Sequence, residues 1–120
     1  MRAAFKIKRV YEAASDEDGF RVLVDRLWPR GLKKETAKID LWAKDIAPSD
    51  ALRRGFHGHP EHWEKFVAKY REELAQEPAA SAVRDLQARR KRGPITLLYA
   101  ARDEEHNNAV ALKAWLETQG

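Results

Sequence analysis

The stretch ITLLYA, residues 95–100, is the most apolar strand candidate in the chain. It follows Gly93 and Pro94, which are ordinary stop signals for a preceding helix. A short run of aliphatic and aromatic residues without polar alternation is typical of a strand that is covered on both faces. We therefore expect residues 95–100 to form the central strand, with the rest of the chain arranged around it.

Two further strands precede this one. The stretch FKIKRVY, residues 5–11, alternates apolar and basic residues, which is typical of a half-exposed edge strand. The stretch VLVDRLWPRG, residues 22–31, begins as a buried strand and then turns polar. Because the linking segment EAASDEDG is short for a parallel crossover, we expect an antiparallel hairpin, with a parallel pair joined by a tight loop as the alternative.

Helical spacing dominates the middle of the chain. In residues 35–47, Ile39, Trp42 and Ile46 recur at intervals of three and four until Pro48, which predicts a helix. The segment ALRRGF, residues 51–56, predicts a short helical turn capped by Ser49 or Asp50 and broken by Gly55.

Three longer helices are expected after this turn. The first begins at Pro60, the second begins near Pro78 and ends in the basic run of residues 89–92, and the last has Asp103 as its cap. Their inward positions are Trp63, Phe66, Val67, Tyr70 and Leu74, then Ala79, Ala82, Val83 and Leu86, then Ala109, Leu112 and Leu116. Residues 1–120 are thus predicted to form one small α/β domain, with a largely parallel sheet of three or four strands and about four or five helices.

Composition narrows the class of protein. A chain of 120 residues with 43% hydrophobic content suits one core, and the absence of cysteine excludes disulfides, thiolate metal sites and a cysteine nucleophile. No apolar run reaches the length of a membrane-spanning helix and no signal peptide is visible, so we expect a soluble cytoplasmic protein without a membrane partner. The net charge of +4 modestly favours anionic partners and leaves the oligomeric state open.

Polar side chains follow the two most apolar strands, in the segments of residues 25–31 and 101–108. Ligands collect at the carboxyl ends of parallel strands because the loops there converge on one crevice. The candidate site residues are Asp25, Arg26, Trp28, Arg30, Asp103, His106, Asn107 and Asn108.

These residue types suit an anionic, ring-bearing ligand. Arg26 and Arg30 would clamp the anion, Trp28 would stack on the ring, and two asparagines at a helix start would supply hydrogen bonds. If a reaction occurs, His106 or Asp25 is the candidate general base. The alternative is structural: Asp25 pairs with an arginine, Trp28 covers the core and Arg30 is solvated.

Three histidines, His57, His59 and His62, lie close together in the stretch FHGHPEH, residues 56–62. Their spacing matches no metal motif with a known geometric reason, and His59 before Pro60 is held extended while His62 lies within a helix. We therefore expect the rings to diverge, no shared metal ion and no cofactor. His57 is retained as a ligand-binding candidate because it lies in a loop.

Three strings, DGFRVLVDRLWPRGL (18–32), KIDLWAKDIAPSDALRRGFHG (38–58) and LLYAARDEEHNNAVAL (97–112), resemble the YeaO-like family, an uncharacterised branch of the DUF488 superfamily. The resemblance covers Lys8 to Leu116. It implies a small cytosolic prokaryotic α/β protein and brings no established activity.

The wider superfamily suggests which positions line a site. Its Asp-Val-Arg segment, followed by a proline and a basic residue, corresponds to Asp25, Arg26, Pro29 and Arg30. Its Cys-His-Arg string corresponds to residues 107–109, within one residue of register. Since the cysteine is absent here, the resemblance carries over no thiol chemistry.

Three functions from different classes follow. The first is a site for an anionic or nucleotide-like small molecule, either catalytic or purely ligand-binding. The second is a nucleic-acid-binding or regulatory module, suggested by the basic run of residues 89–92, although cations at a helix end also complement its dipole. The third is a protein-interaction or structural role.

Overall fold

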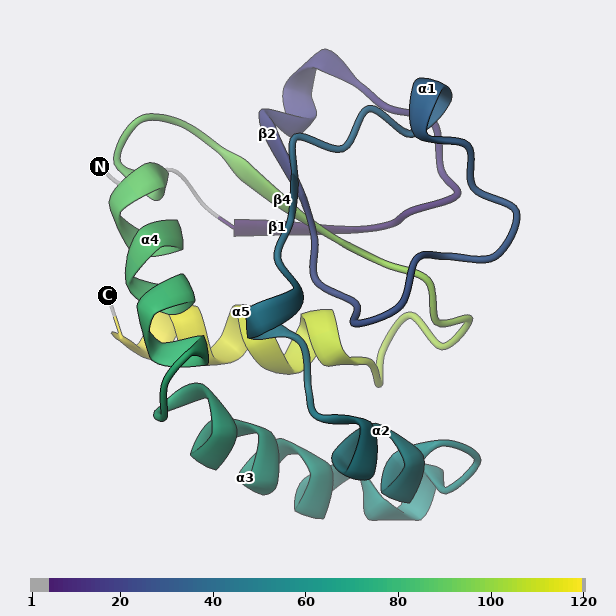
Figure 1. Ribbon diagram of the computed structural model, residues 1–120, viewed down its shortest axis with the longest axis vertical. Coiled ribbons are helices and arrows are strands. Elements are labelled where there is room, and N and C mark those ends of the chain that lie inside the picture. Colours follow the sequence, from purple (N-terminus) through teal and green to yellow (C-terminus); the bar gives the residue numbers. More distant parts are fainter. Residues whose placement is uncertain (1–4, 120) are drawn as a thin grey trace.

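Within residues 5–119, which the computed structural model describes, the chain forms a four-stranded, all-parallel sheet in the order β1-β4-β2-β3 (Figure 1). The strands are β1 (Phe5–Arg9), β2 (Phe20–Leu23), β3 (Leu41–Trp42) and β4 (Ile95–Tyr99). The α-helices are α1 (Lys34–Ala37), α2 (Asp50–Phe56), α3 (Trp63–Leu74), α4 (Ala79–Arg90) and α5 (Asn108–Gln119). Three short 3-10 turns complete the fold: η1 (Asp16–Asp18), η2 (Lys44–Ile46) and η3 (Pro60–His62). The α/β class and the parallel sheet are confirmed.

Strand β4 is central, as its sequence predicts. All of its residues are buried, and it pairs with β1 on one side and β2 on the other. Strand β1 lies at the edge of the sheet, where its alternating lysines reach solvent or polar partners. Burial of both faces of β4 therefore explains why its sequence is a continuous apolar run.

The expected antiparallel hairpin between the first two strands is wrong. Strand β4 lies between β1 and β2, and all three run in the same direction. The link between β1 and β2 returns across the sheet, where Asp18 accepts hydrogen bonds from Lys8 and Arg21, and the Thr96 hydroxyl donates to the Asp18 carbonyl at 2.7 Å. Gly19 (φ +66°) closes this link, because a Cβ there would lie 2.3 Å from the Pro94 carbonyl oxygen.

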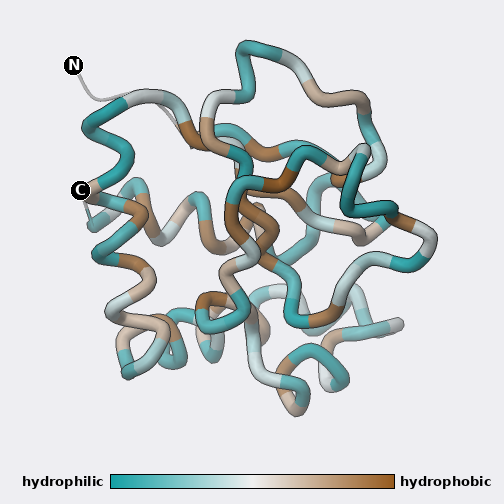
Figure 2. Tube along the Cα trace, turned by 45° about the horizontal axis from the view of Figure 1, so that its top comes forward, coloured by the Kyte–Doolittle hydropathy of each residue, from teal (hydrophilic) through white to brown (hydrophobic). Residues whose placement is uncertain are grey.

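Helices cover one face of the sheet. Helix α5 packs on β1 and β4, and α3 packs on α2, α4 and α5. The predicted inward face of α3 is confirmed, since Phe66, Tyr70 and Leu74 are buried and Trp63 and Val67 are half-buried. Figure 2 shows hydrophobic segments gathered where the strands and helices meet. No described helix is long and apolar enough to cross a membrane.

The helix expected over residues 35–47 is wrong. Helix α1 ends at Ala37, Lys38 adopts a left-handed conformation (φ 52°), and β3 pairs with β2. Ile39 and Trp42 pack in a small core on the face opposite the long helices, while Ile46 packs in the main core. The helical spacing is therefore a coincidence, because these side chains serve opposite faces of the sheet.

Candidate functional site

The ends of β2 and β4 meet at the carboxyl edge of the sheet, as the parallel pairing requires. Asp25, just past β2, accepts a hydrogen bond from the Ala100 backbone amide at Oδ2 (3.0 Å). Its Oδ1 accepts from the Asn108 side-chain amide (3.0 Å), which also donates to the Val24 carbonyl (2.9 Å). The loops after β2 and β4 therefore meet at this edge, where Asp25 contacts Asn108.

The Asp25 carboxylate lies in a largely desolvated position. Burial raises its pKa, while hydrogen bonds from Asn108 and Ala100 and the charge of Arg53 act in the opposite direction. The indole Nε1 of Trp42 donates to the Asp25 carbonyl at 2.8 Å. Asp25 therefore holds several elements together, and both carboxylate oxygens already have donors.

Arg26 points from the same loop toward the segment before α2. Its Nε donates to the Pro48 carbonyl (3.0 Å) and its Nη2 to the Ala47 carbonyl (3.2 Å). No carboxylate of the described residues lies within 4.0 Å of its guanidinium, and the residue is half-buried. Its positive charge is therefore held in place but not neutralised by an acid.

Arg53 is a further cation that the sequence did not indicate as a candidate. It lies one turn into α2, and its Nη2 makes only a long ion pair, 3.5 Å, with the exposed Asp50. Its Nε is buried and has no hydrogen-bond partner. In the sequence, Arg53 is marked only by its position in the short helix that Ser49 caps. Arg54 lies in the same helix, so the sequence does not distinguish the two arginines.

Trp28 lies in the small core on the loop-covered face of the sheet, and Arg30 follows it in the same loop. Trp28 packs edge-on against Trp42 with ring centroids 5.3 Å apart, and its Nε1 donates to the Leu32 carbonyl at 2.8 Å. Arg30 is exposed, and its carbonyl accepts from the Tyr11 hydroxyl at 2.7 Å. Among residues 5–119 no hydrogen bond, ion pair or ring contact joins Trp28 or Arg30 to the segment of residues 106–108.

Asp103 does not cap the last helix, contrary to expectation. Its Oδ1 accepts from the amides of Glu105 and His106, while α5 begins at Asn108. Asn107 supplies the cap instead, since its Oδ1 accepts from the Val110 amide at 2.9 Å. The backbone forms an extra turn around Asp103. Helix α5 therefore begins later than the acidic residues 103–105 predict.

His106 lies at the rim of this edge. Its Nδ1 is 3.1 Å from Asp103 Oδ2, and its ring meets Trp63 edge-on with centroids 5.2 Å apart. The Asp103 pKa is lowered by hydrogen bonds from the Glu105 and His106 backbones and from the His106 ring. His106 is therefore oriented by an ionised carboxylate, though no contact joins it to Asp25 in the described structure.

Of the three histidines between α2 and α3, His59 and His62 lie together and His57 lies outside their group. His57 is exposed and caps the end of α2 with its backbone amide. The rings of His59 and His62 stack, with centroids 5.0 Å apart and planes at 17°. The expectation that the rings diverge is therefore wrong for this pair.

A groove of about 550 Å³ lies between α2 and α3, away from the predicted site. Its lining includes the apolar Leu52 and Phe56 as well as Lys65 and Lys69. The groove could not be predicted from the sequence, because its walls come from two helices whose relative position is set by packing.

Comparison with known proteins decides the family. The model of the inactive DUF488-N3 subclade matches residues 4–120. The chain belongs to the DUF488 family. It is 45% identical over 112 residues to the uncharacterised protein YeaO of Escherichia coli (strain K12), covering 92% of this chain and 95% of that protein. It is 39% identical over 107 residues to the uncharacterised protein Rv3073c of Mycobacterium tuberculosis (strain ATCC 25618 / H37Rv), covering 89% and 88% of the two chains.

The family assignment confirms the resemblance seen in the sequence. The comparison with solved structures found no match to this chain. At the start of the last helix, Asn107 caps α5 and Asn108 bonds to Val24 and Asp25. Both side chains are therefore engaged in holding the fold together.

Proposed function

We propose that this protein binds an anionic small molecule at the carboxyl edge of the sheet, through Arg26 and Arg53, without catalysing a reaction on it. One observation carries the proposal: the half-buried guanidinium of Arg26 is fixed by two carbonyl oxygens and has no acidic partner among the described residues. A carbonyl oxygen orients a guanidinium but leaves its full positive charge available.

Arg26 retains donors for a ligand. A guanidinium carries five N–H groups in a fixed fork, and Arg26 uses two of its nitrogens on Pro48 and Ala47. Because the position is partly shielded from water, an anion there interacts more strongly than at a fully exposed arginine. The two carbonyl bonds also reduce the entropy that the side chain loses on binding.

We infer that Arg53 supplies a second positive group near Arg26, because its charge acts on the Asp25 carboxylate. Its buried Nε–H lacks an acceptor, and an unpaired buried donor costs about 1 to 3 kcal/mol. An anionic oxygen would satisfy it, and the long pair with exposed Asp50 is a weak competitor. The electrostatic effect of Arg53 on Asp25 links it to the end of β2.

Three features favour binding without catalysis. Both oxygens of Asp25, a candidate base, accept hydrogen bonds from within the protein. The side chains of Asn107 and Asn108, which the resemblance to the wider superfamily matches to its Cys-His-Arg string within one residue, are engaged structurally. The matching family model describes an inactive subclade.

The ligand class is a compound that bears a phosphate or carboxylate, nucleotides included, because these groups match the arginine fork. Trp28 is not part of the proposed site, since its ring is packed against Trp42. Arg30 is likewise left out, which makes it a matched control.

The test is calorimetric titration with inorganic phosphate, nucleoside monophosphates and the corresponding nucleosides. We expect a monophosphate to bind and its nucleoside to bind far more weakly. Arg26→Lys and Arg53→Ala should weaken binding by about 10- to 100-fold, the scale of a lost charge-assisted hydrogen bond.

Arg30→Ala removes the same charge from an exposed position and should leave the affinity unchanged. Equal losses in all three variants would mean nonspecific attraction, and a loss confined to Arg30→Ala would move the site to the other face. Circular dichroism of each variant establishes that the fold is intact.

A further inference from the structure

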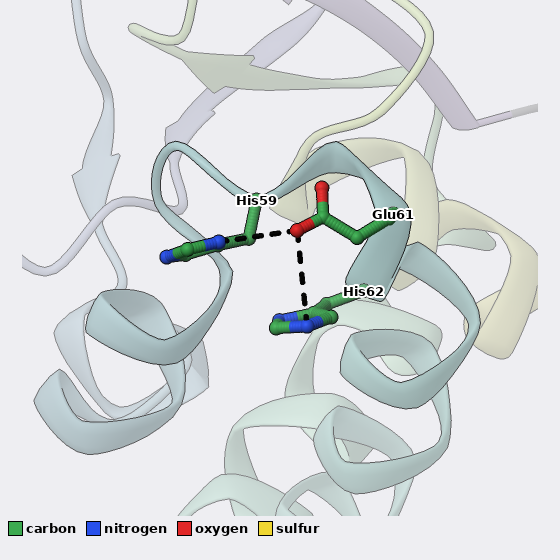
Figure 3. Close-up of side chains that lie close together, drawn as sticks. All are labelled: His59, Glu61 and His62. Atoms are coloured by element: carbon green, nitrogen blue, oxygen red, sulfur yellow. Dashed lines mark hydrogen bonds and ion pairs between the residues drawn. The ribbon is translucent and has the colours of Figure 1, made fainter.

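His59, Glu61 and His62 form a compact group on the turn between α2 and α3 (Figure 3). His59 precedes η3, and Pro60 begins it. Side chains three residues apart eclipse one another in a 3-10 turn, which explains why the rings of His59 and His62 stack. The local backbone therefore brings two imidazoles to the same side as the carboxylate.

One carboxylate oxygen faces both rings. Glu61 Oε1 is 3.1 Å from His59 Nδ1 and 3.9 Å from His62 Nε2. One ligand atom from each of the three residues lies within 4.8 Å of the others. Figure 3 shows this Glu61 oxygen beside the two rings, facing one nitrogen of each.

The hydrogen bond on the far side of His62 determines which nitrogen is available. Its Nδ1 lies 3.3 Å from the Gly55 carbonyl oxygen, which can only accept, and this contact favours the tautomer with the proton on Nδ1. In the neutral ring, Nε2 then presents a lone pair toward Glu61 Oε1. Two acceptors that face each other are stabilised by a cation between them.

We propose that His59, Glu61 and His62 bind one divalent transition-metal ion. Metal–ligand distances of about 2.0 to 2.2 Å require ligand atoms roughly 3.0 to 3.4 Å apart, so only modest side-chain closure is needed. The side chains are 54%, 63% and 47% exposed, which leaves them free to rotate.

The donor set selects the class of ion. Two imidazole nitrogens and one carboxylate oxygen suit zinc, nickel or copper, whereas magnesium and calcium prefer oxygen ligands. Glu61 adds the negative charge of an exposed carboxylate to this donor set. The remaining coordination positions would be open to water.

The Gly55 carbonyl oxygen contacts Nδ1 of His62, the ring nitrogen that would not bind the ion. A hydrogen bond to the non-coordinating nitrogen of a histidine fixes the tautomer and the ring orientation needed for coordination. Gly55 and His62 also line the groove between α2 and α3, so the ion would lie at the border of that groove.

The test is titration of the untagged protein with zinc and nickel chloride by isothermal calorimetry, with magnesium chloride as the comparison ion. We expect one zinc or nickel ion per chain and no magnesium binding. His59→Ala, His62→Ala and Glu61→Gln should each weaken zinc binding by at least about tenfold.

His57→Ala is the matched control, because His57 is an exposed histidine of the same segment that lies outside the group. It should retain the wild-type affinity. Zinc should also raise the thermal unfolding midpoint of the wild type and of His57→Ala, but not of His59→Ala.

Absence of zinc and nickel binding at millimolar metal would overturn the proposal. So would stoichiometric binding that His59→Ala and His62→Ala leave intact, or binding that His57→Ala abolishes.

Discussion

The side-chain amide of Asn108 donates to the Asp25 carboxylate across 3.0 Å, and the two residues are 83 positions apart in the chain. The same amide bonds to the Val24 carbonyl, while the Ala100 amide holds the other oxygen of Asp25. The ends of β2 and β4 and the start of α5 are thus tied together by one carboxylate. Asp25 and Asn108, which the sequence indicates as candidate site residues, therefore also stabilise the carboxyl edge of the sheet.

Removing the Asn108 amide should therefore destabilise the fold. Asn108→Ala leaves the Val24 carbonyl and one oxygen of Asp25 without their donor, and we expect a loss of about 1 to 3 kcal/mol in the free energy of unfolding. Urea denaturation at pH 7 measures it. Asn108→Asp, which keeps the shape but faces Asp25 with a like charge, should cost more; a change in Asn108→Ala below about 0.5 kcal/mol would contradict the cross-link.

Asp18 should give the protein a pH-dependent contribution to stability. Burial alone would raise its pKa, but hydrogen bonds from Lys8, Ser15 and Arg21 outweigh it, and the pKa is lowered from 3.8. A lowered folded-state pKa stabilises the fold above the unfolded value, and this contribution is lost as the pH falls through the folded value.

We therefore expect Asp18→Asn to cost about 3 to 5 kcal/mol at pH 7, because it leaves the buried Arg21 charge without its partner. The difference from wild type should shrink on acidification below pH 3.8. Denaturation curves across the acid range measure both effects. Asp16→Asn, at an exposed position of the same turn, should remain within about 0.5 kcal/mol, and a pH-independent gap for Asp18→Asn would refute the assignment.

Phe66 is a test of the helical layer. It is 3% exposed and stacks on Phe56 with ring centroids 4.7 Å apart. Phe66→Ala should lower the free energy of unfolding by about 3 to 5 kcal/mol through lost burial and the cavity left behind. Lys69→Ala, on the exposed face of the same helix, should change it by less than about 0.5 kcal/mol; similar values for the two variants would contradict the burial of this face.

The basic run at the end of α4 should affect stability more than nucleic-acid binding. Arg89 lies 3.8 Å from the centroid of the Phe20 ring and Arg90 lies 4.5 Å from that of Phe5. Replacing both arginines by alanine should cost about 1 to 2 kcal/mol, at roughly 0.5 to 1 kcal/mol for each cation–π contact. The matched double variant of the exposed Lys91 and Arg92 should cost less than about 0.5 kcal/mol.

Titration of the same proteins with duplex DNA and RNA at low and physiological salt tests the alternative function. We expect no micromolar binding at physiological salt. If the wild type shows such binding and the Arg89/Arg90 double variant loses it, the result would favour the hypothesis that the protein binds nucleic acid.

The candidate site was partly visible in the sequence. Asp25, Arg26 and Asn108 follow apolar strands, and the rule that parallel strands share a carboxyl edge indicated that their loops meet. Arg53 was not indicated, because its partnerless Nε depends on how α2 packs beside the edge. Trp28 shows the opposite case: it follows the same strand, but the loop carries it to a core on the far face.

The sequence by itself determined the α/β class, the central burial of β4, the inward face of α3 and the family, because these depend on local apolar patterns and on long matching strings. Only the tertiary structure decided that β4 separates β1 from β2, that Leu41–Trp42 pairs with β2 as a strand, and that Asp25 reaches Asn108. Strand order and side-chain pairing depend on contacts between distant segments. Those contacts override local spacing because burying apolar surface against an existing sheet contributes more free energy than the helix propensity of a short segment.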